Sequence, residues 1–330
     1  LSPDRVDLLR ALSRLLLASN EYSSAAETIE KQRDLSDGGD RAQCEVDLAL
    51  LYADKLEQPS RALAAGIRAI ELRPRDADAI GVLARLMDLA ETRVGAATVL
   101  RRAYADLGDA RREAQALRVM LEGTSDEAER YELHMALAEV EAEALSSPSA
   151  AFNVVLRALN ERADEIALWD RAQDLARRAG RPTDLAEAYR SHILSPHEDQ
   201  PLSREVELEL CDRAAVLHDE QLGDSEGALP YLKRVLSIEP DNERAFDRLK
   251  QILTAAERWG ELEDLFLQAV EGAVDEHQKI VLLGEVAMVA EEVIGLPQKA
   301  IGYHERILEL DPLNASSLDA LEKLYEDAEH

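Results

Sequence analysis

Apolar residues recur at spacings of three and four along nearly the whole chain. Two such stripes are Leu249, Ile252 and Leu253, and Leu282, Val286, Val289 and Val293. This spacing places apolar side chains on one face of an α-helix. The alternating runs that would indicate β-strands are missing, and the strong helix formers Ala, Leu, Glu and Arg dominate. The pattern predicts an all-α protein.

Glycine and proline lie between the apolar stripes rather than within them. Examples are Gly180-Arg181-Pro182, Gly223-Asp224 and Gly295-Leu296-Pro297. Such residues stop and start helices, so we expect about eighteen helices, each of roughly 12–22 residues. The links between them are about two to five residues long, and short links make neighbouring helices antiparallel.

The helices repeat. Three segments, Pro59–Leu86, Ser225–Ile252 and Pro297–Leu324, overlay without gaps. Each has a small residue, a proline twelve positions later, and two apolar residues nine and twelve positions after the proline. These markers are Ala62, Pro74, Leu83 and Leu86; Ala228, Pro240, Leu249 and Ile252; and Ala300, Pro312, Leu321 and Leu324. The regularity predicts a repeat architecture.

A fourth copy extends from Pro148 to Leu175 and has Ala163 where the proline is expected. Its marker alanine is Ala151, and the four marker alanines lie 89, 77 and 72 residues apart. The repeating unit is therefore about 72 residues, or four helices. A longer loop around residues 195–201 explains the second spacing, and one additional helix near residues 90–108 explains the first.

The markers have physical reasons. A small residue lets two helices pack closely, and proline ends a helix because it lacks an N–H donor. A following Asp or Asn, such as Asn242, can cap the next helix. Hairpins of this kind bury their apolar faces only by stacking, so we expect one continuous solenoid, roughly 90 Å long at about 10 Å per hairpin. Its expected parts are a partial unit 1–40, units of about 41–125, 126–201 and 202–273, and a partial unit 274–330.

In its second helices the chain resembles the tetratricopeptide repeat (TPR). The segments Glu226–Pro240 and Gln298–Pro312 are the most typical, whereas the first-helix signature is reduced to Tyr52, one residue from its usual place. The chain is similar to long, divergent bacterial repeat arrays. This resemblance implies an α-α superhelix of antiparallel hairpins, a TPR-like solenoid, that acts as a protein–protein interaction scaffold with its first helices lining the groove.

A search for catalytic patterns gives little. No phosphate-binding glycine loop, dinucleotide fingerprint or His-Glu-x-x-His motif occurs. The triplet His197-Glu198-Asp199 could hold a metal, but a contiguous loop triplet is more often a solvated linker. Five further histidines are isolated: His134, His192, His218, His277 and His304. We predict no enzyme activity, no cofactor and no metal.

The two cysteines, Cys44 and Cys211, lie among apolar helix positions. We interpret both as small buried hydrophobes, because free cysteine is among the most buried residue types. A Cys/His nucleophile pair is the alternative, and nothing in the sequence supports it.

The charge balance excludes some partners. The chain has 67 acidic residues against 38 Lys and Arg, a formal net charge of −29. Residues 201–330 hold 30 of the acids and 12 of the bases. Such a charge opposes binding to nucleic acid. There is no run of 18 apolar residues and no signal-peptide pattern, so we expect no membrane insertion and a cytoplasmic protein, although a removed leader is compatible with a chain that begins at Leu1.

Acids recur where the four long first helices end. They are Asp54 and Glu57, Glu141 and Glu143, Asp219 and Glu220, and Glu291 and Glu292. Acids at a helix C-terminus oppose the helix dipole, so another reason for them is expected. One hypothesis is a groove that binds a basic or amphipathic segment; the alternative is an ordinary solvated acidic surface. The predicted partner-binding residues are Asp54, Glu143, Asp212, Asp219, Glu220, Glu291 and Glu292.

Two further features suggest contacts. The arginines Arg101, Arg102, Arg111, Arg112 and Arg118 form a cluster. We expect them to pair with Glu113 and Glu122 rather than to bind phosphate. The last helix, expected at Leu313–Ala328, has an apolar stripe that we expect to be uncovered and available for self-association: Leu318, Leu321, Leu324 and Tyr325.

Alternatives to the scaffold remain at this point. One is an all-α enzyme whose hairpins close into a toroid around a cavity, and the low aromatic content, 4%, argues against it. Another is an inert spacer or regulatory arm of a longer protein. Both ends of the sequence fall inside repeat units, which makes a fragment of a longer protein our expectation.

Overall fold

A computed structural model describes residues 3–195 and 201–329 of the chain. Within these residues there are eighteen α-helices, several short π- or 3₁₀-helical segments and no strand. The predicted all-α fold and helix number are confirmed. The chain divides into two compact units, one of residues 1–161 and 167–180 and the other of residues 162–166 and 181–330.

The first unit holds the first ten helices, except the first residue of α10. Their bounds are α1 (Pro3–Ala18), α2 (Tyr22–Leu35), α3 (Gly38–Asp54), α4 (Pro59–Leu72), α5 (Ala77–Leu86), α6 (Arg93–Leu107), α7 (Ala110–Gly123), α8 (Glu127–Glu139) with the π-helical η1 (Val140–Ala144), α9 (Pro148–Leu159) and α10 (Ile166–Ala179).

The second unit holds the remaining eight helices. Their bounds are α11 (Pro182–Tyr189) with η2 (Arg190–Leu194), α12 (Arg204–Val216) with η3 (Leu217–Leu222), η4 (Ser225–Ala228) with α13 (Leu229–Ile238), α14 (Glu243–Ala255), α15 (Trp259–Gly272), α16 (Glu276–Met288) with η5 (Val289–Ile294), α17 (Pro297–Leu310) and α18 (Ala315–Glu329).

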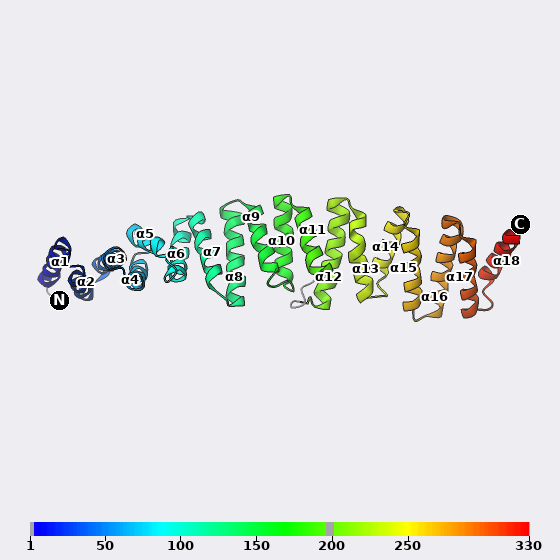
Figure 1. The fold of residues 1–330 in the computed structure, drawn as a ribbon, viewed down its shortest axis with the longest axis horizontal. Coiled ribbons are helices and arrows are strands. Elements are labelled where there is room, and N and C mark those ends of the chain that lie inside the picture. The colour runs from blue at the N-terminus through cyan, green and yellow to red at the C-terminus, as the bar shows by residue number, and fades with distance from the viewer. Residues whose placement is uncertain (1–2, 196–200, 330) are drawn as a thin grey trace. The chain divides into compact units, whose positions relative to one another are not determined.

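Within each unit the helices pack as sequential antiparallel hairpins (Figure 1). From α1 to α9 and from α11 to α18, each helix contacts its neighbours along the chain, and some contact the next helix but one, as α3 does α5 and α4 does α6. The buried residues therefore form a row between helices rather than one central core.

One kind of hairpin turn follows α3, α8, α12 and α16. A residue with positive φ comes first, and the next residue has φ between −118° and −114°. The N–H of that second residue donates to the carbonyl six residues earlier, at 2.8–2.9 Å. The positive-φ residues are Glu57, Ser146, Gly223 and Gly295. We call these pairs (α3–α4, α8–α9, α12–α13, α16–α17) the first-kind hairpins.

A second kind of turn follows α1, α6 and α14. Its positive-φ residues are Asn20, Gly108 and Glu257, and the closing N–H donates to the carbonyl five residues earlier, at 2.9 Å in each case. After α10, Gly180 also has a positive φ, of 65°. The two kinds alternate along the chain, and this alternation marks the four-helix repeat in the backbone itself. Helix α6 lies in the range, 90–108, for which one additional helix is predicted.

The repeat markers have the roles that the sequence suggested. Ala62, Ala228 and Ala300 are buried, and the marker prolines lie in the short turns before α5, α14 and α18. The side chain of Asn242 accepts a hydrogen bond from the N–H of Ala245 at 3.0 Å and caps α14. Asp76 and Asn314 cap the equivalent helices α5 and α18.

The π-helical turns changed one predicted stripe. In α16–η5, Val286 is buried as expected, but Val293 is half-exposed. The buried face there is formed by Leu283, Val286, Ala287 and Ala290. A π-turn holds more residues than an α-turn, so it rotates the residues that follow it away from the face that strict α-spacing assigns.

Candidate partner-binding surface

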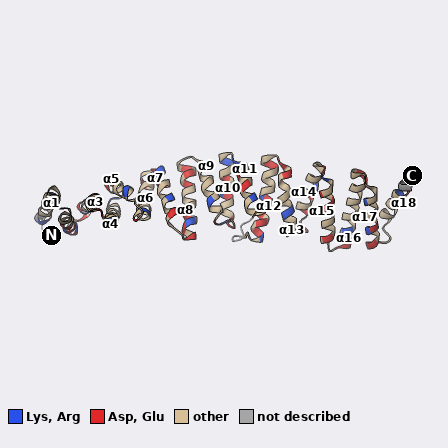
Figure 2. Ribbon diagram, in the orientation of Figure 1, with Lys and Arg blue, Asp and Glu red and all other residues tan. Residues whose placement is uncertain are grey.

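Four of the seven predicted partner-binding acids have a basic partner on the next helix but one. Arg85 Nη1 of α5 lies 2.6 Å from Asp54 Oδ1. Arg178 Nη1 of α10 lies 2.8 Å from Glu143 Oε1. Figure 2 shows that acidic and basic residues both occur along the helices of each unit. Each of these acids therefore links the first helix of a first-kind hairpin to the helix that follows that hairpin.

The second unit has the same arrangement. Lys323 Nζ of α18 lies 3.2 Å from Glu291 Oε1. Asp219 accepts a hydrogen bond from Ser225 Oγ at 2.6 Å and forms an ion pair with Arg248 of α14. The Ser225 hydroxyl and the Arg248 guanidinium lower the pKa of Asp219. A base about one hairpin downstream of each acid is the sequence signal that could have identified these pairs.

The other three predicted acids, Asp212, Glu220 and Glu292, are exposed. None forms an ion pair with any residue in 3–195 or 201–329. Partial desolvation raises the pKa of Asp212, although nearby Arg244 acts in the opposite direction. Asp212 and Glu220 lie on the same helix, α12 with its extension η3, and Glu292 lies on η5.

A groove brings three of the seven predicted acids together. It runs between α12–η3 and α14, with α13 as its floor, and has a volume of about 460 Å³. Its charged lining consists of Asp212, Asp219, Glu220, Asp247, Arg244 and Arg248. We call it the α12–α14 groove. Sequence reasoning missed Asp247, which is exposed and lines the groove from the opposite helix.

The floor of this groove is apolar. Ala215, Ala228, Leu232 and Ala245 line it, and all four are buried. After the Asp219–Arg248 ion pair is set aside, three carboxylates face one guanidinium, that of Arg244. A segment with basic side chains and an apolar face matches such a lining in both charge and polarity.

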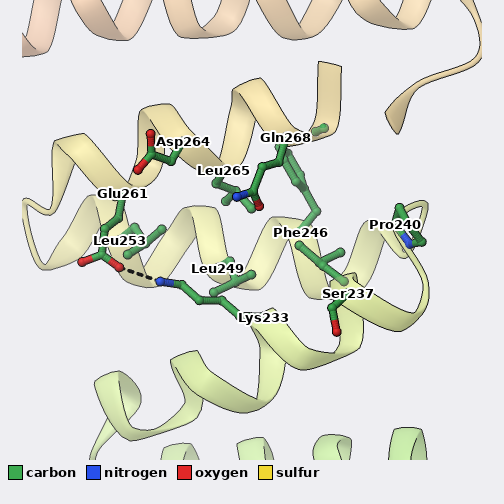
Figure 3. Close-up of a pocket in the computed structure, with 12 residues that line it drawn as sticks. Lys233, Ser237, Pro240, Phe246, Leu249, Leu253, Glu261, Asp264, Leu265 and Gln268 are labelled. Carbon is green, nitrogen blue, oxygen red and sulfur yellow. Dashed lines mark hydrogen bonds and ion pairs between the residues drawn. The ribbon is translucent and has the colours of Figure 1, made fainter. Parts of the chain in front are cut away.

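A second crevice lies between α13 and α15, with α14 as its floor (Figure 3). Its volume is about 330 Å³, and Phe246, Leu249, Leu253 and Leu265 make up much of its apolar lining. At one end Lys233 Nζ lies 2.6 Å from Glu261 Oε2, so its one basic lining residue already has a partner. The crevice has a smaller excess of acid than the α12–α14 groove.

Cys44 and Cys211 are both buried and free, which confirms the sequence interpretation. Desolvation raises the pKa of the Cys44 thiol to about 11 and that of Cys211 to about 12. Since the thiolate is the nucleophile, neither thiol is activated for covalent chemistry near neutral pH.

Two of the described histidines are in the protein interior. His134 and His304 are buried, and desolvation lowers the pKa of each. His134 Nε2 lies 3.6 Å from Glu161 Oε1, and His304 Nδ1 lies 3.2 Å from Ser317 Oγ. The triplet His197-Glu198-Asp199 falls outside the described residues. Within the described ranges no three His, Cys, Asp or Glu side chains form a group that could hold a metal ion.

The arginine cluster pairs with other acids than those predicted. Arg118 forms an ion pair with Glu141 of η1. Arg112 Nε lies 3.5 Å from Asp109 Oδ2, and Glu122 is paired with Arg93. The prediction was wrong for Glu122, whose partner Arg93 lies on α6 outside the cluster. Burial raises the pKa of Glu113, and nearby Arg101 of the cluster acts in the opposite direction.

The predicted C-terminal stripe is half covered. Leu321 and Leu324 are buried, whereas Leu318 and Tyr325 are about half-exposed. Tyr325 Oη also donates a hydrogen bond to Glu305 Oε1 of α17 at 2.8 Å. The expectation of an uncovered stripe was therefore wrong for Leu321 and Leu324, which contribute to the buried face of α18. None of the described helices combines the length and apolar character needed to cross a membrane.

No protein-family model matches this sequence, and the search of curated proteins gives no match. Structural neighbours across most of the chain are TPR repeat proteins, at low sequence identity. The chain is similar to one in the structure of Naa15/Naa10 bound to HypK, with 16% identity and a TM-score of 0.27. That match covers 96% of this chain and 55% of the other, so this chain spans about half of that neighbour's length.

Two other solved structures are matched. YrrB, described as a TPR protein with an unusual peptide-binding site, is 16% identical, with a TM-score of 0.28, covering 67% of this chain and 97% of that one. A tetratricopeptide repeat protein from Parabacteroides merdae is 11% identical, with a TM-score of 0.24, covering 98% and 99%.

Proposed function

We propose that this protein is a non-catalytic interaction scaffold that binds a basic or amphipathic segment of a partner protein in the α12–α14 groove. The observation that carries the proposal is the set of three carboxylates, Asp212, Glu220 and Asp247, that line an apolar-floored groove without an ion-pair partner among the described residues. Acids that served only the fold would have partners of the kind that Asp54 and Glu143 have.

Charge and shape act on different aspects of this binding. The exposed carboxylates attract a basic segment and set its orientation, whereas burial of its apolar side chains against Leu232 and its neighbours supplies most of the affinity. In the unit that holds the groove, the ion-paired acid Glu291 contributes to the wider acidic field rather than to direct contacts. Glu292 extends the unpaired acidic surface to the next repeat in the same unit.

The test is a binding measurement with a defined probe. The probe is a fluorescently labelled helical peptide of lysine and leucine, and its control replaces each lysine with glutamate. The test variant carries Asp212→Asn, Glu220→Gln and Asp247→Asn. A matched control removes three exposed acids elsewhere in the same unit, through Glu271→Gln, Glu309→Gln and Asp319→Asn.

We expect the lysine probe to bind and the glutamate probe not to bind. The groove variant should bind about tenfold more weakly, since each exposed pair contributes about 0.5 kcal/mol. The matched control should stay within about twofold of the wild type, because its charges act only through the screened field. Equal losses of probe affinity in the two variants would show that the overall negative charge, and not the groove, attracts the probe. That result would overturn the proposed site.

A further inference from the structure

A hollow lies in the second unit where α14 begins, α15 ends and α16 begins. Its volume is about 560 Å³. Phe246 of α14, Ala269 of α15 and Leu282 of α16 line it, together with Val274 of the turn between α15 and α16. Val274 is 97% exposed, which is unusual for a large apolar side chain in a short turn. We call this site the α14–α16 hollow.

The first unit contains a matching set of three helices. Helices α6–α8 correspond to α14–α16 position by position, without a gap, at an offset of 149 residues (108 to 257). The landmarks are two positive-φ turn residues and the cap of the third helix: Gly108 with Glu257, Ser146 with Gly295, and Asp126 with Asp275. The residues around the hollow can therefore be compared one by one.

In the first unit two side chains fill the corresponding space. Val94 of α6 lies over Gly123 at the end of α7, so that a Cβ added to this glycine would be 2.2 Å from Val94 Cγ2. Met120 of α7 is only 7% exposed. At the matching positions the second unit has Glu243, which is exposed, and Ala269. The hollow is open because an acid replaces an apolar residue and a small residue replaces a large one.

The turn beside the hollow is more apolar than its counterpart. Ala273 and Val274 are found where the first unit has Thr124 and Ser125. A Cβ added to Gly272, just before this turn, would lie 3.7 Å from the nearest side chain, so the space over this glycine is free. Apolar surface that is left uncovered next to free space is typical of an interaction site.

The rim of the hollow is acidic. It is lined by Asp241, Glu243, Asp247 and Asp275, and by none of the described Lys, Arg or His residues. Asp275 has a role in the fold, because its side chain accepts hydrogen bonds from the N–H groups of His277 and Gln278 and caps α16. The remaining three acids favour a ligand with a basic group beside its apolar part.

The hollow adjoins the α12–α14 groove. Asn242 and Asp247 line both sites. Pro240 and Phe246, which Figure 3 labels, line both the hollow and the crevice between α13 and α15. A segment bound in the α12–α14 groove therefore reaches the hollow by crossing the first turn of α14.

We propose that the α14–α16 hollow is an anchor pocket for one large aliphatic side chain, of the size of methionine, in the partner segment that the α12–α14 groove binds. The anchor lies beyond the amphipathic stretch of that segment and has a basic neighbour that faces the acidic rim. The size of the anchor follows from Met120 and Val94, which fill the matching space in the first unit. This inference rests on the proposed function and adds a second, apolar subsite to it.

Three labelled peptides test the anchor. The first is the lysine and leucine helix of the binding measurement above. The second is the same helix extended at both ends by two glycines, a methionine and a lysine, because either end can face α14. The third has serine in place of each methionine and the same charge. We expect the methionine peptide to bind about tenfold more tightly than the serine peptide, since one methionine side chain leaves water.

A variant that fills the hollow locates the anchor. Ala269→Met introduces the side chain that the first unit has at this position, and it should abolish the preference for the methionine peptide. Its affinity for the unextended helix should stay within about twofold of the wild type, which also shows that the variant is folded. Ala255→Met is the matched control, because it adds the same side chain at an exposed position near the end of α14. It should keep the tenfold preference.

The outcomes separate this inference from the proposed function. Equal affinity of the methionine and serine peptides for the wild type would overturn the anchor pocket and leave the α12–α14 groove as a binding site. A preference for methionine that persists in Ala269→Met would mean that the anchor binds elsewhere, and it would overturn the assigned hollow. Failure of all three peptides to bind would overturn the proposed function and, with it, this inference.

Discussion

Arg68 Nε of α4 lies 2.8 Å from Glu45 Oε1 of α3, and the Glu45 side chain is 1% exposed. Arg33 of α2 is the next base, at 3.7 Å. The carboxylate of the Glu45–Arg68 pair is therefore buried, whereas pairs such as Glu143–Arg178 are exposed to solvent. The two kinds of pair look alike in sequence.

The difference predicts unequal costs. Arg68→Met leaves a buried carboxylate without its close partner and should lower the free energy of unfolding by about 3 kcal/mol. Arg178→Met breaks the exposed pair with Glu143 and should cost less than about 1 kcal/mol. Urea denaturation of both variants measures this, and similar costs would contradict the distinction between the two kinds of pair.

Gly227 tests the packing of a first-kind turn. A Cβ there would lie 2.2 Å from His218 Nδ1 and 2.4 Å from Asp224 Oδ2. Gly227→Ala should therefore lower the free energy of unfolding by about 1–3 kcal/mol through overpacking. Gly284→Ala is the matched control, since nothing lies within 4 Å of its added Cβ. It should stabilise the chain by about 0.4–1 kcal/mol, because alanine lowers the conformational entropy of the unfolded chain. Thermal unfolding that ranks the variants the other way would refute this packing.

Acidification should destabilise the fold through its buried histidines. Desolvation lowers the pKa of His134 more than Glu161 raises it, and desolvation also lowers the pKa of His304. An unfolded histidine takes up its proton near pH 6.5, whereas these folded ones stay neutral to lower pH. The contribution to stability is therefore full above about pH 7 and falls as the pH drops through 6.5 toward the folded pKa.

His134→Leu should weaken this pH dependence. His134 lies twelve residues before Ser146, the positive-φ residue of the turn after α8. Leu283 lies twelve residues before Gly295 in the equivalent turn after α16 and is also buried, so leucine is found at this position in another repeat. The measurement is the change in urea midpoint between pH 7.5 and 5.5. His277→Gln alters an exposed histidine and should leave that change as it is in the wild type. A change of equal size in His134→Leu would show that other groups carry the acid sensitivity.

Binding of the lysine probe should also depend on salt. Exposed charges are screened over about 8–10 Å at physiological ionic strength, so affinity should fall as salt rises from about 0.02 to 0.15 M. The groove variant, with three fewer carboxylates, should show a shallower dependence. Affinity that does not respond to salt would mean that the carboxylates of the groove take no part in recognition.

Much of the fold was predictable because its determinants are local. Apolar spacing fixed the helices, and the marker alanines, prolines and caps such as Asn242 are all defined by neighbours within one hairpin. The π-turns were not predictable in the same way. Val293 fits an α-helical stripe with Val286, and only the π-helical geometry after Met288 explains why Val293 is half-exposed while Ala290 is buried.

The candidate site was predictable only in part. Helix-end acids were recognised in sequence, but whether an acid has a partner depends on a base about thirty residues away, as with Asp54 and Arg85. Sequence spacing does not show which helix faces meet. Asp219 and Glu220 were therefore equally good candidates for partner binding in the sequence, although only Asp219 is ion-paired in the structure. Asp247 was missed because it lies mid-helix, away from any repeated pattern of acids.

The most direct test of the scaffold account is a hydrogen-exchange footprint of the bound lysine probe. The account predicts slower exchange in α12–η3 and α14, the two walls of the α12–α14 groove. In α16–η5 it predicts little change except at Glu292. The footprint should disappear in the Asp212→Asn, Glu220→Gln, Asp247→Asn variant. Protection confined to other helices, or bound probe that leaves both walls unprotected, would contradict the account.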